Sequence, residues 1–134
     1  MIAAIVPQFF STDLHASLAY YRDALGFETQ FTFGEPAFYA GAIRNGFSIF
    51  FRQVDEMPPC AGNKYEVELL DAYIRVHDVH GLHAEYAARN VEVFRELADR
   101  PWGFTEFVVK DGDGRLLCFG QDTELVAPDG RRAT

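Results

Sequence analysis

Three histidines, His77, His80 and His83, follow one another at intervals of three residues and are the first candidates for metal binding. A spacing of three places side chains on one face of a helix. However, His77 precedes the expected start of a helix, and zinc sites in proteins use three or four converging ligands. Because no fourth ligand occurs at a suitable spacing, we interpret His80 and His83 as parts of a solvated helix face, with Leu82 and Tyr86 on the buried face.

The two cysteines, Cys60 and Cys118, lie in a predicted linker and in a predicted strand. A Cys–His catalytic dyad stays open, but no neighbouring residue supports one, and two free structural thiols are expected. Residues 111–114 (Asp-Gly-Asp-Gly) lead from one strand into another strand rather than into a helix. They therefore indicate a hairpin turn and not a phosphate-binding loop.

Trp102 is the only tryptophan and stands between Pro101 and Gly103, at the start of a predicted strand. Two interpretations are open: a core tryptophan, or a stacking platform for a flat or cationic ligand. Aromatic residues also crowd the first half of the chain. One face of each strand covers a helix, so the other face points into any concavity of the sheet. These aromatic residues are Phe31, Phe33, Phe38, Tyr39, Phe47, Phe50 and Phe51.

The 134 residues carry 12 Lys and Arg against 20 Asp and Glu, a net charge of -8. This balance disfavours nucleic-acid binding and association with an anionic membrane, and it attracts cationic partners. No signal peptide and no membrane-length apolar run are evident. The sequence therefore indicates a soluble, reduced, cytoplasmic protein.

Residues 3–10 predict a strand, and Pro7 indicates that this strand lies at the edge of a sheet or pairs in an unusual way. Asp13 then caps a predicted helix, Leu14 to Leu25, which Gly26 ends. Alternating apolar residues predict three further strands joined by turns, one of them at Asn45-Gly46. These strands are 27–33, 38–43 and 47–53.

The second half repeats this order. Asp13-Leu14-His15 recurs as Asp78-Val79-His80, 65 positions later, and Asn90 takes the place of Gly26. Neither β-α-β-β-β unit can close a core alone, so the two are expected to pair. Strands are predicted at 70–76, 91–96, 104–109 and 115–120. The domain boundaries are a first module 1–54, a linker 55–67, a second module 68–121 and a polar tail 122–134.

The paired layout, together with the pattern Asp13-x-x-x-Ser17-x-x-x-Tyr21-x-x-x-Leu25-Gly26-Phe27, resembles the vicinal oxygen chelate superfamily over about residues 3–121. This superfamily includes glyoxalase I, extradiol dioxygenases and the bleomycin resistance proteins. Val6-Pro7, the segment 39–44, Pro101-Trp102-Gly103 and Glu106-Phe107 are most similar to the bleomycin resistance proteins. The resemblance implies an α+β fold in which two β-α-β-β-β modules form a cup-shaped mixed sheet with helices outside.

Enzymes of this superfamily hold a divalent metal with His, Gln or Glu from the first and last strands of each module. The corresponding positions here are Val6, Phe50, Asp71 and Cys118. Val6 and Phe50 offer no donor atom, and a thiol is a poor ligand for metals that prefer oxygen. We therefore expect neither a metal nor a cofactor.

The resemblance instead implies a cytoplasmic homodimer that binds a flat, cationic, antibiotic-like ligand in aromatic, acidic clefts at the subunit interface, as antibiotic resistance proteins do. Gln30 stands where the family can carry a carboxylate, and Glu35 is expected to supply the negative charge. The expected ligand-binding residues are Gln30, Phe31, Glu35, Phe38, Tyr39, Phe50, Tyr73 and Trp102.

Two alternatives stay open. One is a glyoxalase- or dioxygenase-like enzyme with an atypical metal site, made of Asp71 with some of His77, His80, Gln8 and Glu106. The other is a dimer that binds another protein through a large apolar patch.

Overall fold

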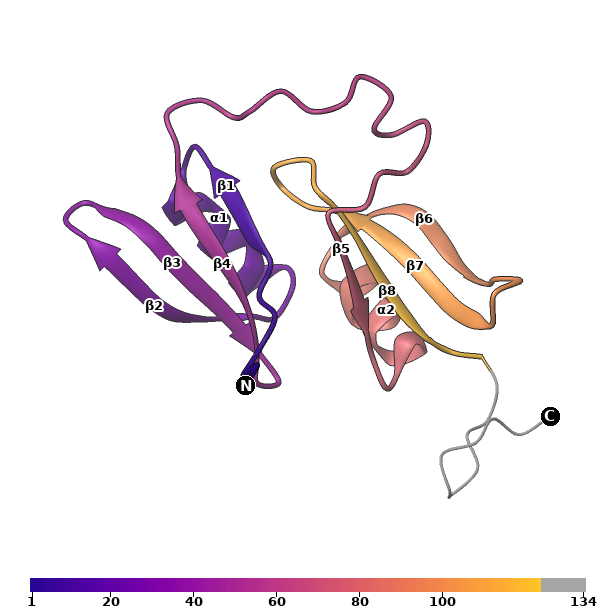
Figure 1. The fold of residues 1–134 in the computed structure, drawn as a ribbon. Helices are drawn as coiled ribbons and strands as arrows, with labels where there is room; N and C mark the ends of the chain where they lie inside the picture. Colours follow the sequence, from indigo (N-terminus) through magenta and orange to yellow (C-terminus); the bar gives the residue numbers. More distant parts are fainter. Residues whose placement is uncertain (124–134) are drawn as a thin grey trace. The chain divides into compact units, whose positions relative to one another are not determined.

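A computed structural model describes residues 1–123 and divides the chain into two compact units, one before and one after the boundary between Val67 and Glu68. Each unit has the order β-α-β-β-β (Figure 1). The first contains β1 (Gln8–Ser11), α1 (Leu14–Asp23), β2 (Glu28–Gly34), β3 (Ala37–Arg44) and β4 (Phe47–Gln53). The second contains β5 (Ala72–Arg75), α2 (Val79–Ala88), β6 (Glu92–Asp99), β7 (Phe104–Lys110) and β8 (Leu116–Asp122).

Each unit forms a four-stranded mixed sheet, with strand orders β1-β4-β3-β2 and β5-β8-β7-β6. The first strand of each unit pairs in parallel with the last, and the other pairings are antiparallel. The parallel pairings place Gln8 beside Phe50 and Tyr73 beside Cys118. The predicted α+β fold and the edge position of the first strand are confirmed.

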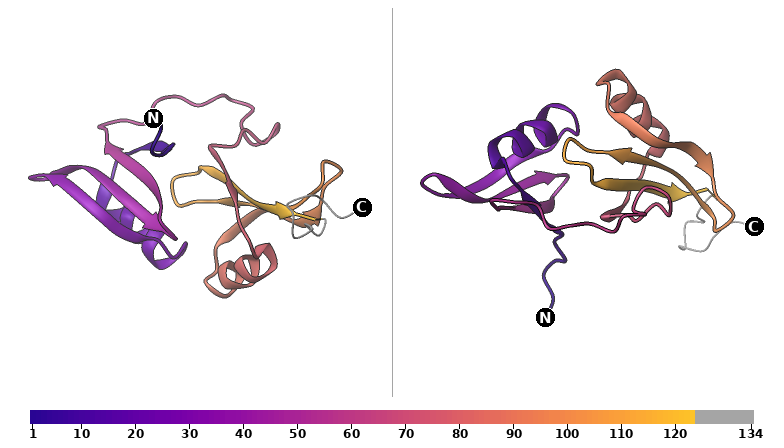
Figure 2. Two further views of the ribbon diagram at one scale, coloured as in Figure 1. Left: turned by 60° about the horizontal axis from the view of Figure 1, so that its bottom comes forward. Right: turned by 90° about the horizontal axis from the view of Figure 1, so that it is seen from above.

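One face of each sheet is covered by the helix of the same unit (Figure 2). In the first unit the ring of Tyr21 on α1 packs edge-on against Phe51, with centroids 4.9 Å apart. In the second unit Tyr86 on α2 packs in the same way against Phe119, at 5.4 Å. Because side chains alternate along a strand, Phe50 and Cys118 point away from the helices.

The two helices begin with the same set of hydrogen bonds. Asp13 and Asp78 accept from the backbone N–H three residues later, as N-cap residues do. In addition, the first helical N–H of each helix donates to a glutamine side chain of the last strand: Leu14 to Gln53 and Val79 to Gln121, both at 2.9 Å. Each glutamine therefore ties the start of a helix to the sheet that the helix covers.

Most predicted boundaries agree with the structure to within a few residues. Gly26 and Asn90 follow the helices with φ of 77° and 58°, in the left-handed conformation expected there. The predicted strand 3–10 is wrong in its first part, because regular pairing begins only at Gln8. The strand predicted at 70–76 is shorter, Ala72–Arg75, and the last strand extends to Asp122. Of the predicted tail, residues 124–134 lie outside the described part of the chain.

The expectation for the histidines needs one correction. His80 is exposed, but His83 is half-buried and its ring lies edge-on against Phe107, 5.1 Å away. His83 also contacts Glu96 at 3.3 Å. His83 therefore packs between α2 and the sheet instead of joining a solvated face.

The turn between β7 and β8 confirms the hairpin that the Asp-Gly-Asp-Gly run predicts. Asp111 and Arg115 are both buried and form an ion pair of 2.8 Å. The other Asp111 oxygen accepts from the backbone N–H groups of Asp113 and Arg115. These partners compensate the Asp111 carboxylate for its burial, which would be costly without them, so Asp111 has a structural role in the turn.

Within residues 1–123, no helix has the length and apolar character that crossing a membrane requires.

We expect Gln53→Ala and Gln121→Ala each to lower the free energy of unfolding by about 1 kcal/mol, because each leaves a helix-starting N–H without its acceptor. Urea unfolding followed by circular dichroism measures the change. Gln30→Ala is the matched control, since this exposed glutamine accepts from the Ser48 hydroxyl at 2.8 Å and not from a helix-starting N–H. A cost no larger than that of the control would show that the helix starts do not need the glutamines.

Candidate functional site

Glu106 on β7 is more deeply buried than Asp111 and Arg115, the other buried charged residues among residues 68–123, because only 2% of its surface is exposed. Its carboxylate accepts from the Tyr73 hydroxyl at 2.6 Å, from Arg95 Nη2 at 2.9 Å and from the Trp102 indole N–H at 3.4 Å. Burial by itself raises the pKa of a carboxyl group, but these donors outweigh it. The pKa of Glu106 therefore lies below the ordinary value of 4.5, and the group is a permanent negative charge near neutral pH.

Arg95 joins Glu106 to a second carboxylate. Its Nε donates to Glu68 at 2.5 Å, while its Nη2 donates to Glu106. Arg95 lies on β6 between two irregularities in the pairing with β7, after Val93 and before Ala98. Such irregularities redirect a side chain relative to a regular strand. This group of three charges carries one net negative charge.

Tyr73 reaches Glu106 because residue 120 is a glycine. A Cβ atom built on Gly120 would lie 2.0 Å from the Tyr73 hydroxyl oxygen, so any larger residue would displace the ring. Burial and the hydrogen bond to Glu106 raise the pKa of Tyr73 well above its usual range. Tyr73 is nevertheless 40% exposed, so one part of the ring is open to solvent while the hydroxyl is fixed.

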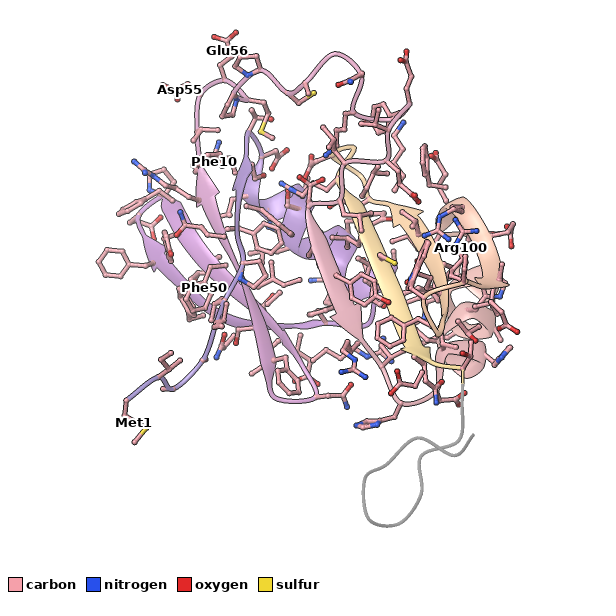
Figure 3. The ribbon with its side chains drawn as sticks, turned by 45° about the vertical axis from the view of Figure 1, so that its right-hand side comes forward. Met1, Phe10, Phe50, Asp55, Glu56 and Arg100 are labelled. Carbon is pink, nitrogen blue, oxygen red and sulfur yellow. The ribbon has the colours of Figure 1, made fainter. Side chains whose placement is uncertain are left out.

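Trp102 lies in the turn between β6 and β7, and 57% of its surface is exposed. The core interpretation of this residue is therefore wrong. The indole N–H points to the Glu106 carboxylate, and the guanidinium of Arg100 lies over the ring at 5.3 Å from its centroid. Arg100 is labelled in Figure 3. The ring is thus held at its nitrogen by a buried charge while much of its surface stays open.

The first unit has an aromatic cluster on the sheet face that points away from α1. Phe31 and Tyr39 are stacked with centroids 5.9 Å apart, and Phe50 meets both rings edge-on, at 5.3 and 6.0 Å. Phe50 is labelled on β4 in Figure 3. Gly41 makes room for Phe31, whose ring would clash with a Cβ atom there. The Tyr39 hydroxyl donates to Gln8 at 2.5 Å.

Three other candidates belong to the first unit. Gln30 is exposed and accepts from the Ser48 hydroxyl, and its Oε1 atom lies at the edge of the aromatic cluster, beside Gly41 as the Phe31 ring does. Phe38 is half-exposed near the β2–β3 turn and packs against Phe33 at 5.5 Å. Glu35 lines an open groove of about 570 Å³ between this turn and the start of α1. The structure thus groups Phe31, Tyr39 and Phe50, and it groups Tyr73 with Trp102, while Glu35 and Phe38 stand apart from the aromatic cluster.

The positions assigned to metal ligands need a correction. Val6 and Asp71 lie outside the strands, and the observed register places Gln8 and Tyr73 in the rows of Phe50 and Cys118. These residues do not fit a divalent metal either. Phe50 has no donor atom, Gln8 is hydrogen-bonded to Tyr39, and Tyr73 is hydrogen-bonded to Glu106.

Cys118 is an equally poor ligand. Burial, together with the charge of Glu106, raises the pKa of its thiol to about 12, which disfavours the thiolate that binds metals. Asp71 accepts from the Leu116 backbone N–H at 2.9 Å and so has a structural contact. Within residues 1–123, no group of three His, Cys, Asp or Glu side chains is placed to hold a metal ion.

The sequence gives little indication of three charged residues around Trp102. Glu68, Arg95 and Arg100 were not among the expected site residues, and Glu106 appeared only in the family pattern and in the enzyme alternative. The available signal was Glu106, which directly precedes the apolar residues 107–109 of β7, since a glutamate is rarely buried without partners. Which residues pair depends on the register and the irregularities of β6.

Comparisons with known proteins agree with this fold. A family model described as the Glyoxalase/Bleomycin resistance protein/Dioxygenase superfamily matches residues 2–119. A search of curated proteins gave no match.

Similar solved structures include TioX from Micromonospora sp. ML1, with 21% identity, a TM-score of 0.72 and coverage of 90% of this chain and 98% of that one. The bleomycin-binding protein from bleomycin-producing Streptomyces verticillus, complexed with copper(II)-bleomycin, has 23% identity, a TM-score of 0.67 and coverage of 89% and 95%. A glyoxalase-related enzyme from Clostridium phytofermentans has 12% identity, a TM-score of 0.72 and coverage of 91% and 96%. At these identities the likeness concerns the fold.

The depressed pKa of Glu106 predicts a pH-dependent contribution to stability. A carboxyl group whose pKa is lower in the folded state stabilises the fold above its unfolded pKa, and this contribution is lost as pH falls through the folded pKa. We expect the unfolding free energy of the wild type to fall more steeply below about pH 4.5 than that of Glu106→Gln. Urea unfolding at a series of pH values measures both slopes. Parallel curves for the two proteins would contradict the assigned role of Glu106.

Proposed function

This chain belongs to the Glyoxalase/Bleomycin resistance protein/Dioxygenase superfamily, and from that premise we propose that it is a binding protein that sequesters a flat, cationic, antibiotic-like molecule without a metal. The observation that carries the proposal is the exposed indole of Trp102, whose N–H is held by the buried carboxylate of Glu106. An exposed indole whose N–H donates to a buried carboxylate contributes little to folding, so its placement favours a role in binding.

The chemistry of this place favours a planar cation. Stacking of two aromatic rings contributes about 0.5–1.5 kcal/mol beyond the burial of area. A cation over an indole adds about 0.5–1 kcal/mol at an exposed site and about 2 when water is excluded. The net negative charge of Glu68, Arg95 and Glu106 acts in the same direction. The overall charge of -8 raises the local concentration of cationic ligands.

The first unit offers a second aromatic surface. Phe31, Tyr39 and Phe50 lie on the face that α1 leaves uncovered, and all three are partly exposed. In the proposal these rings are a stacking surface for a flat ligand, and Gln30 supplies a hydrogen-bonding edge. Glu35 and Phe38, near the β2–β3 turn, contact a more distant part of the ligand, such as a cationic tail.

The similar structures include binding proteins as well as a glyoxalase-related enzyme, so the fold is compatible with the proposed binding function. The Streptomyces verticillus protein binds copper(II)-bleomycin, and a bleomycin resistance determinant encoded on the transposon Tn5 matches this chain with a TM-score of 0.72 at 17% identity. The enzyme alternative requires metal donors from Asp71 with some of His77, His80, Gln8 and Glu106. Asp71, Gln8 and Glu106 each accept hydrogen bonds from other groups of the chain, and within residues 1–123 no three His, Cys, Asp or Glu side chains are placed to hold a metal ion. The proposed protein therefore works by holding its ligand, with no reaction.

We further propose that the functional form is a cytoplasmic homodimer with its binding clefts at the subunit interface. Both units have exposed apolar side chains, for example Phe10 and Phe33 in the first unit, and these support a surface that binds a second subunit. Sedimentation equilibrium at micromolar concentration should give twice the mass of 15.1 kDa. A monomer that still binds the ligand would overturn the interface cleft and leave the binding function standing.

The principal test is Trp102→Ala. We expect it to weaken binding of metal-free bleomycin at least tenfold in titration calorimetry, since both stacking and cation–π contact are lost. The same change should lower the unfolding free energy by only about 1 kcal/mol, because the ring is largely exposed and Glu106 keeps Tyr73 and Arg95 as donors. Trp102→Phe should restore part of the affinity. Phe47→Ala is the control, because it removes an aromatic ring on β4 that is 78% exposed, and it should leave binding unchanged.

Equal losses of affinity and stability in Trp102→Ala would return this residue to a structural role. Binding in the wild type should also weaken as salt rises, because the attraction of a cationic ligand is screened. A stoichiometric content of nickel, zinc, iron or manganese in the purified protein would support the enzyme alternative.

A further inference from the structure

The cation position on Trp102 is already occupied by a group of the chain itself. Arg100 and Trp102 are two residues apart in the β6–β7 turn, and the guanidinium lies 5.3 Å from the centroid of the indole. The turn is held by its backbone: Arg100 N–H donates to the carbonyl of Phe104 at 2.8 Å, and Gly103 N–H donates to the carbonyl of Arg100 at 3.0 Å. The side chain of Arg100 can therefore move without opening the turn.

Arg100 is poorly compensated where it lies. Its Nε atom is buried and has no hydrogen-bond partner among residues 1–123. A buried donor without an acceptor is unfavourable relative to the same donor in water. Release of Arg100 from the ring would therefore lose a cation–π contact and regain the hydration of its Nε atom.

Arg75 provides the contrast within the same unit. Its guanidinium lies 5.2 Å from the centroid of the Phe104 ring, in a similar contact, but it also donates to Asp122 at 3.2 Å. Arg75 thus has a carboxylate partner that holds it in place. Within the described residues, Arg100 Nε has none.

The charges around Trp102 change when Arg100 leaves. Glu68 and Glu106 both pair with Arg95, and the three residues together carry one net negative charge. Arg100 balances this charge while its guanidinium lies over the Trp102 ring. Without Arg100 over it, the indole is an open aromatic face with its N–H on the Glu106 carboxylate, and the single net negative charge of Glu68, Arg95 and Glu106 is no longer balanced.

We propose that Arg100 is an internal competitor that occupies the cation position of Trp102 and must be displaced by the ligand. This inference rests on the proposed binding function and specifies its ligand as an aromatic ring that itself carries the positive charge. Such a ligand replaces the guanidinium charge and adds ring stacking. A neutral ring leaves the negative charge unbalanced, and a small ammonium ion only replaces one cation by another.

The experiment uses N-methylquinolinium as the charged aromatic probe, quinoline as its neutral analogue and tetramethylammonium as the non-aromatic cation, each titrated by calorimetry near neutral pH. The variants are Arg100→Gln and the matched control Arg75→Gln. We expect Arg100→Gln to tighten N-methylquinolinium binding about two- to fivefold, the effect of removing one partly exposed cation–π competitor. Quinoline should gain less, tetramethylammonium should bind most weakly to the wild type, and Arg75→Gln should change nothing.

A readout without any ligand uses the single tryptophan of the chain. Fluorescence quenching of Trp102 by caesium ions, relative to quenching by acrylamide, should increase in Arg100→Gln because a cation no longer covers the ring. The ratio in Arg75→Gln should equal that of the wild type. An unchanged ratio in Arg100→Gln would contradict the coverage of the ring by Arg100 in solution.

The outcomes separate this inference from the proposed function. If the wild type binds N-methylquinolinium and Arg100→Gln binds it equally or more weakly, Arg100 is not a competitor and the binding function stands. If neither protein binds any planar probe, the proposed function fails and this inference fails with it. If only Arg100→Gln binds, the competitor role is supported in its strongest form.

Discussion

The burial of the Glu106 carboxylate constrains the whole second unit. A carboxylate removed from water is tolerated only with several donors, and here these come from Tyr73, Arg95 and Trp102. Each donor has its own requirement: Tyr73 needs the glycine at position 120, and Arg95 needs the irregular stretch of β6. The partners of this one buried carboxylate therefore lie on the two edge strands of the sheet, β5 and β6, and in the β6–β7 turn. The hydrogen bond to the carboxylate orients the exposed indole.

The two units share a fold but not a surface chemistry. Both attach the start of the helix to the last strand through a glutamine, Gln53 or Gln121, and both pack a helix tyrosine against a strand phenylalanine. On the opposite sheet face, the first unit presents stacked aromatic rings and the second presents a charged network. The helix-facing side thus repeats its main contacts in both units, while the opposite side differs in its chemistry.

Charge acts at two ranges in this protein. The overall charge of -8 is a long-range property that attracts any cation and is screened by salt. Close to Trp102 the balance is different, because Arg95 and Arg100 neutralise Glu68 and Glu106. Attraction and selectivity are therefore separate properties, and a cation drawn in by the overall field still has to match the local arrangement around the indole.

The sequence by itself determined the order of strands and helices, the repeat of 65 residues, the helix ends at Gly26 and Asn90 and the turns at Asn45-Gly46 and Asp111–Gly114. These features follow from local periodicity and from residues with special backbone preferences, which act over a few positions. Only the tertiary structure decided that Glu106 meets Tyr73, 33 residues away, and Arg95, 11 residues away. It also decided that Val6 and Asp71 lie outside the strands. Such pairings depend on strand register, and a shift of one residue exchanges the two faces of a strand, so short-range patterns could not fix them.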